Sequence, residues 1–137
     1  MAELTINAKL ENLDQVLAFV DSELEKAGCH MKDQMQIDLA VEELYVNIVH
    51  YAYPGGMGSA TIQVDLAQAE TAEVWITFLD EGIPFDPLAK ADPDVTLTAA
   101  EREIGGLGIY IVKKSMDRML YERKDGKNIL RICKKLR

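Results

Sequence analysis

The sequence predicts an α+β fold, a two-layer α/β sandwich in which helices cover one face of a mixed sheet. Three observations support this class. Apolar residues recur at helical spacing in two long N-terminal segments, runs rich in β-branched residues come in sequential pairs, and turns containing glycine or proline separate these segments. Sequential strand pairs with helices grouped between them are typical of such sandwiches.

The N-terminal half is expected to hold one strand and two helices. The strand covers about residues 4–8, and a helix with one apolar face follows over about residues 11–28. Asp33 is expected to cap a second helix that continues to about Ala52. The buried stripe of this second helix consists of Ile37, Ala40, Val41, Leu44 and Ile48.

The C-terminal half is expected to be mostly sheet. The runs "SATIQVDL" and "AEVWITFLD" predict a hairpin, and "RMLYERK" and "NILRICKK" predict a second hairpin joined by the turn "DGKN". A helix between the two hairpins carries Ile109, Val112, Met116 and Met119. Because no linker or repeat interrupts the chain, residues 1–137 are expected to form a single domain.

Composition excludes several classes of protein. The net charge of −8 argues against nucleic-acid and anionic-membrane binding, which normally require a basic face. Cys29 and Cys133 lie far apart with no paired spacing, so neither a zinc site nor a disulfide framework is indicated. No apolar run is long enough for a membrane helix, and the N-terminus does not resemble a signal peptide, so we expect a cytoplasmic protein.

A long irregular segment and its flanks form the first candidate site. Residues 83–104 exceed the roughly 12–15 residues beyond which a loop usually has a function, which suggests a lid. Asp80 and Gly82 precede it; an aspartate at a strand end is more often a turn former than a ligand contact. Glycines that lead into a helix allow the backbone to approach an anion, although a close-packed turn is the plainer interpretation. These following residues are Gly105, Gly106, Leu107 and Gly108.

The second helix carries two further candidates. Glu43 and Asn47 lie one helical turn apart, to one side of the apolar stripe, whereas Glu42 points away from Asn47. A solvated helix edge would explain this pair alone. Combined with the strand-end carboxylate and the glycine segment, the pair makes a coherent site: an amide oxygen for magnesium, a carboxylate base and a phosphate-binding helix entrance.

The segments "EELYVN", "DEGIPFDP" and "EREIGGLGIYIVKKSMD" together resemble the anti-sigma-factor serine/threonine kinase type of the GHKL ATPases, which have the Bergerat ATP-binding fold. The resemblance implies that Asn47 coordinates the magnesium ion on ATP and that Glu43 is the catalytic base. It further implies that Asp80 accepts a hydrogen bond from the adenine amino group and that Gly82 permits the turn beside the adenine ring.

The same resemblance implies that the glycine segment closes around the ATP phosphates, with residues 83–104 as the ATP lid. The residues concerned are Gly105, Gly106, Leu107 and Gly108. Arg102 in the lid could reach the terminal phosphate of ATP. Pro84 stands where the broader superfamily has a second glycine.

Two functions from different classes follow. The first is an ATP- and Mg²⁺-dependent protein serine/threonine kinase that phosphorylates a STAS-type anti-anti-sigma protein, with an RNA polymerase sigma factor as a second partner and a homodimer as an assembly common in such proteins. The second is a nucleotide-dependent module that sequesters its partner without phosphorylating it. Glu43 favours the kinase, because binding alone requires no base. A two-component histidine kinase fits less well, since the chain shows no helical segment bearing a phosphoacceptor histidine.

Overall fold

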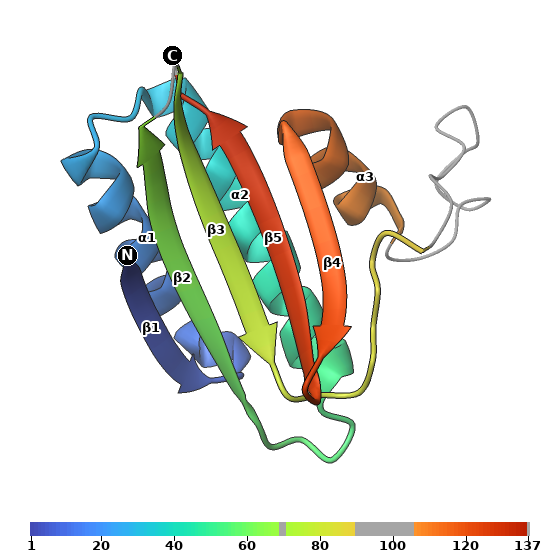
Figure 1. The fold of residues 1–137 in the computed structure, drawn as a ribbon. Helices are drawn as coiled ribbons and strands as arrows, with labels where there is room; N and C mark the ends of the chain where they lie inside the picture. The colour runs from blue at the N-terminus through green and yellow to red at the C-terminus, as the bar shows by residue number, and fades with distance from the viewer. Residues whose placement is uncertain (69–70, 90–105, 137) are drawn as a thin grey trace.

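The computed structural model describes residues 1–68, 71–89 and 106–136. In chain order the elements are β1 (Ala2–Asn7), η1 (Leu10–Asn12), α1 (Leu13–Lys26), α2 (Met31–Asn47), η2 (Ile48–Ala52), β2 (Ser59–Gln68), β3 (Ala72–Asp80), α3 (Gly106–Ser115), β4 (Arg118–Lys124) and β5 (Lys127–Lys135) (Figure 1). The predicted helices and strands are therefore present. One boundary was wrong, because α3 ends at Ser115, so that Met116 follows the helix and Met119 lies in β4.

The sheet has five strands in the order β1-β2-β3-β5-β4 (Figure 1). Every neighbouring pair of the described strands is antiparallel, so the expectation of a mixed sheet was wrong. The reason is the position of β5. It returns from the hairpin with β4 and inserts beside β3, which separates β3 from β4, the strand that would otherwise lie parallel to it.

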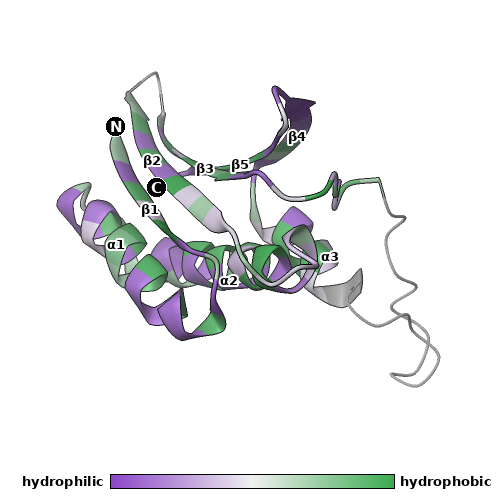
Figure 2. Ribbon diagram, turned by 90° about the horizontal axis from the view of Figure 1, so that it is seen from below, coloured by the Kyte–Doolittle hydropathy of each residue, from purple (hydrophilic) through white to green (hydrophobic). Residues whose placement is uncertain are grey.

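The sheet forms one layer, and α1, α2 and α3 form the other (Figure 2). This confirms the two-layer α+β sandwich. Apolar side chains from both layers fill the space between them, among them Val16, Val20, Leu24, Ile37, Val41, Leu44, Ile62, Val64, Ile76, Phe78 and Ile132. None of the helices in the described part of the chain has the length and apolar content that a membrane-spanning segment needs.

Helix α2 is the central helix, since it packs against both α1 and α3. The residue that caps it is His30, and the predicted cap Asp33 lies instead in the first turn, where it is buried. After Asn47 the helix widens into the π-helical turn η2. This turn brings the carbonyl of Ala52 next to the loop that follows β3, where it accepts a hydrogen bond from Ile83 N at 2.8 Å.

The β4–β5 hairpin turns at Asp125 and Gly126, whose φ angles of 54° and 76° lie in the left-handed region. Two successive positive φ angles are the signature of the tight turn that Asp-Gly sequences favour. The predicted turn is confirmed, and it sets the register of β5 against β4. On its other edge β5 pairs with β3, and there Asn128 lies opposite Asp80, which places an amide beside the strand-end carboxylate.

Candidate functional site

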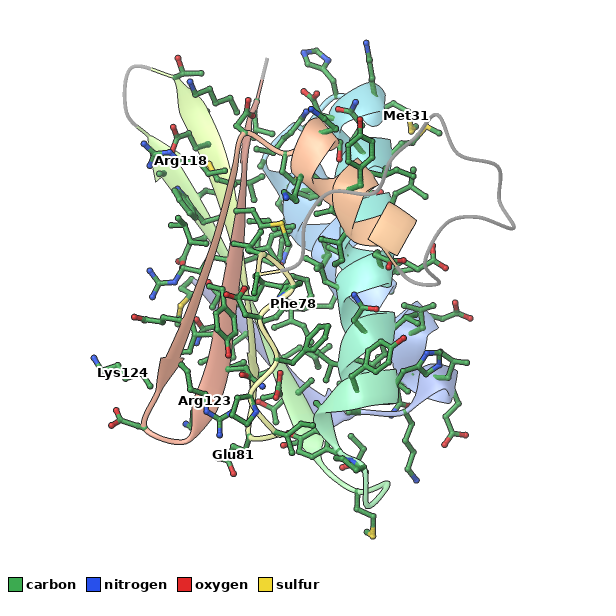
Figure 3. The ribbon with its side chains drawn as sticks, turned by 90° about the vertical axis from the view of Figure 1, so that its right-hand side faces the viewer. Met31, Phe78, Glu81, Arg118, Arg123 and Lys124 are labelled. Carbon is green, nitrogen blue, oxygen red and sulfur yellow. The ribbon has the colours of Figure 1, made fainter. Side chains whose placement is uncertain are left out.

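A cavity of about 30 Å³ lies between α2 and the end of β3. Its apolar walls are formed by Leu44, Ile48, Ala52, Phe78 and Leu130, and Phe78 lies between the sheet and α2 in Figure 3. Phe85 and Pro87 line it from the loop after β3, and the Phe85 ring stacks on Tyr51 at a centroid distance of 5.4 Å. This volume holds water but no aromatic base, so a base can enter only if Phe85 and Pro87 shift.

Asp80 is the carboxylate of this cavity and is only 7% exposed. Its Oδ1 accepts hydrogen bonds from Gly82 N and from Asn128 Nδ2, both at 2.9 Å. The turn-forming role and the ligand role weighed from the sequence are thus compatible, because the turn occupies a single oxygen. Oδ2 of Asp80 has no hydrogen-bond partner within residues 1–68, 71–89 and 106–136 and remains an acceptor for a ligand.

Gly82 is buried against η2. A Cβ atom at this position would overlap the backbone carbonyl of Ala52, so the chain can pass here only as glycine. The loop is held from two further directions, since Ile83 N donates to Ala52 O and Arg123 Nη1 donates to Gly82 O at 2.7 Å (Figure 3). The first residues of the loop are therefore hydrogen-bonded both to the helix layer and to the edge strand β4.

Asn47 lines the same cavity from α2, one helical turn after Glu43. Glu43, on the same face of α2, lies against α3. A Cβ atom at Gly108 would overlap the Glu43 carboxylate, which means that the carboxylate packs directly on the glycine backbone. Burial raises the pKa of Glu43, and the neighbouring charge of Glu42 raises it further.

Glu43 also lines a groove of about 600 Å³ between α2 and α3. The groove is mostly apolar, and its lining includes Leu39, Ala40, Val46, Ile111 and Val112. Leu39 and Ile111 are 60% and 50% exposed, so the groove opens to solvent. Cavity and groove thus adjoin the same turn of α2, with Asn47 lining the first and Glu43 lining the second.

The glycine segment lies at the start of a helix, as expected. Gly106, Leu107 and Gly108 are the first residues of α3. The amide groups of a first helical turn have no partner within their helix and point toward the positive end of the helix dipole, which suits an anion. Gly105, Arg102 and the lid from residue 90 to 104 lie outside the described residues.

Sequence reasoning missed Asn128 and Tyr121. Both lie in strands, on β5 and β4, and their side chains meet in a hydrogen bond of 2.5 Å from Tyr121 Oη to Asn128 Oδ1. An asparagine is disfavoured inside a strand, so its presence one residue after the start of β5 was an available signal. The cross-strand register that places it beside Asp80 was not available from the sequence.

His50 does not join the site. It is exposed on η2, with its ring edge-on to Tyr51 at 6.1 Å. Trp75 lies in β3 with the Arg118 guanidinium 5.9 Å from its ring centroid. Cys29 and Cys133 are both free thiols.

Comparison with known proteins matches residues 6–134 to the family model described as "Histidine kinase-like ATPase domain". Among curated proteins, an anti-sigma F factor of Clostridium acetobutylicum is 28% identical over 133 residues, which cover 97% of this chain and 91% of that protein. The serine/threonine-protein kinase BtrW of Bordetella bronchiseptica is 30% identical over 94 residues, which cover 69% of this chain and 65% of that kinase.

Solved structures share the fold. The RsbU and RsbW domains of Rv1364c from Mycobacterium tuberculosis superpose with a TM-score of 0.64 at 16% identity, over 99% of this chain and 33% of that longer one. The SiaB–SiaC complex from Pseudomonas aeruginosa gives a TM-score of 0.56 at 17% identity, over 97% of this chain and 89% of that one. At such identities the likeness concerns the fold alone.

Proposed function

Because this chain belongs to the histidine kinase-like ATPase family, we propose that it is an ATP-dependent protein serine/threonine kinase that phosphorylates a STAS-type anti-anti-sigma partner in a partner-switching pathway. The similarity to an anti-sigma F factor and to a serine/threonine-protein kinase supports this activity. One observation carries the proposal at the level of residues: a single turn of α2 presents Asn47 to the cavity and Glu43 to the groove.

Once Phe85 and Pro87 have moved out of it, the cavity suits the adenine base. Apolar walls remove the flat ring from water, and Asp80 Oδ2, which has no partner among the described residues, can accept a hydrogen bond from the 6-amino group. Gly82 allows the loop to lie against Ala52 and thereby holds Asp80 Oδ1 in its turn. Phe85 and Pro87 would move from the cavity to cover the base from the loop side.

The magnesium ion is assigned to Asn47. Mg²⁺ typically takes one or two protein oxygens and completes its shell with water and substrate phosphates, so a single amide oxygen next to the cavity fits a metal that arrives with ATP. When bound, the ion would neutralise charge on the phosphate oxygens. Gly105, Gly106, Leu107 and Gly108 would hold those phosphates through backbone N–H groups at the start of α3.

Glu43 is assigned as the base that accepts the proton of the attacking hydroxyl. The raised pKa supports this role, because a carboxylate whose pKa moves toward neutrality is a stronger base. Since Glu43 lines the groove, the hydroxyl of the partner would enter there, past Leu39 and Ile111. Phosphoryl transfer requires mainly this positioning of hydroxyl, metal and phosphate.

The partners are inferred from the relatives. The name of the anti-sigma F factor suggests a sigma factor as a second partner, and the solved complex of SiaB with SiaC shows that a protein of this fold pairs with another protein. A homodimer is part of the same proposal.

The test separates binding from transfer. ATP binding is measured by calorimetry with and without Mg²⁺, and transfer of a labelled γ-phosphate is measured on purified STAS-domain proteins of the same organism. Asn47→Ala should abolish Mg²⁺-dependent binding, whereas Glu43→Gln should bind ATP and lose transfer. Glu11→Gln, which removes an exposed carboxylate that lines neither the cavity nor the groove, is the control.

Equal loss of ATP binding in the Asn47 and Glu43 variants would refute the assigned roles. ATP binding by the unaltered protein with no transfer to any STAS protein would favour the module that sequesters its partner without phosphorylating it. Absence of ATP binding at millimolar concentration would refute both functions.

A further inference from the structure

Asn128 is a buried polar residue for which the proposed activity has no assigned role. It lies on β5 opposite Asp80 in the strand register, and its side chain is only 5% exposed. Buried amides are kept in proteins when their hydrogen bonds are satisfied, because an unpaired buried donor or acceptor is costly. The partners of this amide therefore indicate what it does.

All of its partners are protein groups. Nδ2 donates to Asp80 Oδ1 at 2.9 Å and to the carbonyl of Ile83 at 2.8 Å. Oδ1 accepts from Phe85 N at 3.3 Å and from Tyr121 Oη at 2.5 Å. One side of the amide thus meets only acceptors and the other side meets donors, so its orientation is determined by chemistry.

This arrangement prevents the amide from serving as a donor to a ligand. A flipped amide would place its oxygen against the Asp80 carboxylate and the Ile83 carbonyl, and its NH₂ group against Phe85 N. Both ends would then face groups of their own kind, which leaves buried polar atoms unpaired. The atom at this corner of the cavity that can hydrogen-bond to a nucleobase is consequently Asp80 Oδ2, which is an acceptor.

We propose that Asn128 is a positioning residue that makes the cavity select 6-amino purines over 6-oxo purines. It does so by occupying Asp80 Oδ1, by keeping its own donors engaged, and by fixing the loop at Ile83. A 6-amino group can donate to Asp80, whereas a 6-oxo group would face it as a second acceptor. The inference rests on the proposed ATP site and names the structural basis of its selectivity.

The first experiment compares ATP with inosine triphosphate, whose base carries a 6-oxo group and lacks the 2-amino group of guanine. Binding of both is measured by calorimetry for the unaltered protein and for Tyr121→Phe, which removes one donor that orients the amide. The ATP preference should fall by about 3- to 10-fold in this variant, the size expected for one hydrogen bond. Tyr110→Phe on α3 is the matched control and should keep the full preference.

The second variant, Asn128→Asp, provides a readout that a purely structural role would not produce. Two carboxyl groups at hydrogen-bond distance share one proton, and that proton restores a donor to Asp80 Oδ1. ATP affinity relative to the unaltered protein should be nearly normal at pH 6 and about 10- to 100-fold weaker at pH 8, where both groups ionise. The other ionisable groups near this corner are Arg123, Tyr121, Tyr53 and Glu81, and all of them are unchanged in the comparison.

Gln15→Glu, at an exposed position of α1 that does not line the cavity, controls for the added charge. The inference is refuted if Tyr121→Phe keeps the full ATP preference, or if the affinity ratio of Asn128→Asp does not change with pH. If the unaltered protein binds ATP but either variant gives its refuting result, the role of Asn128 fails and the proposed kinase stands. If the unaltered protein binds no ATP, both fail.

Discussion

The two halves of the candidate site are built differently. The base half consists of Asp80, Asn128 and the start of the following loop, joined by hydrogen bonds between strands and to η2. In the described residues of the phosphate half, Glu43 of α2 packs on Gly108 of α3 beside an open groove. The difference teaches that the residues proposed to recognise the adenine base are positioned by strand pairing, whereas the position of the proposed catalytic base depends on how two helices pack.

Gly82→Ala should break the base half and produce the largest effect. Its Cβ would overlap the backbone carbonyl of Ala52, which cannot rotate away as a side chain can. We expect a loss of about 2–3 kcal/mol in the free energy of unfolding and a parallel loss of ATP affinity. Chemical denaturation and calorimetry measure the two. Gly55→Ala, where an added Cβ meets nothing within 4 Å, is the control, and equal stability of the two variants would contradict the expectation.

Gly108→Ala should break the phosphate half without harming the fold. Here the added Cβ would meet the end of the flexible Glu43 side chain, which can move away, and alanine is favoured over glycine inside a helix. Thermal stability should be unchanged or slightly higher. Phosphoryl transfer should fall by about 100-fold, because a base displaced by about 1 Å loses its geometry. Full activity in a stable variant would show that Glu43 is not held by this contact.

The same contrast explains what the sequence could predict. Local signals found the apolar stripe of α2, the turn at Asp125 and Gly126, and the glycines at both ends of the lid, because each depends on residues close together in the chain. The family prediction rested on such local motifs and is confirmed. The roles of Glu43 and Asn47 remain proposals.

Long-range features were not predictable. The antiparallel insertion of β5 depends on tertiary packing, so the mixed sheet was wrong. The same insertion brings Asn128 and Tyr121 to Asp80, which is why these residues were missed. Asp33 had the chemistry of a helix cap, yet the helix begins earlier because Met31 and Lys32 already have helical backbone.

Asp38→Asn should change stability on the α1 side of α2 and leave both halves of the site intact. Burial is the largest of the causes that together raise the pKa of Asp38 to about 7; the others are a hydrogen bond with Asp21 and repulsion from Asp21 and Glu25. The folded protein therefore keeps a proton between about pH 4 and 7 that the unfolded chain loses, so stability falls as pH rises through that window.

The amide in Asp38→Asn can still donate to Asp21 but cannot ionise. We expect little change in melting temperature at pH 5 and a rise at pH 8 of about 3–4 °C, corresponding to about 1 kcal/mol after allowance for solvent screening of this half-exposed side chain. Glu122→Gln on β4, an exposed loss of the same charge, is the control. An equal rise in melting temperature at both pH values would contradict the raised pKa of Asp38. A change in ATP affinity would show that this side of α2 is coupled to the site.

Glu42→Gln should have the smallest effect and would sharpen the account of the phosphate half. The charge of Glu42 adds to burial in raising the pKa of Glu43, so its removal should lower that pKa. A base must be ionised to act, and the rate of transfer rises with pH through the Glu43 pKa. The acid limb of the kcat/KM profile should therefore move to lower pH with the plateau unchanged.

Glu42 is exposed, so added salt should cause part of the same shift in the unaltered protein. Glu42→Asp keeps the charge and should keep the profile; a shift common to both variants would mean that the limb reports a group other than Glu43.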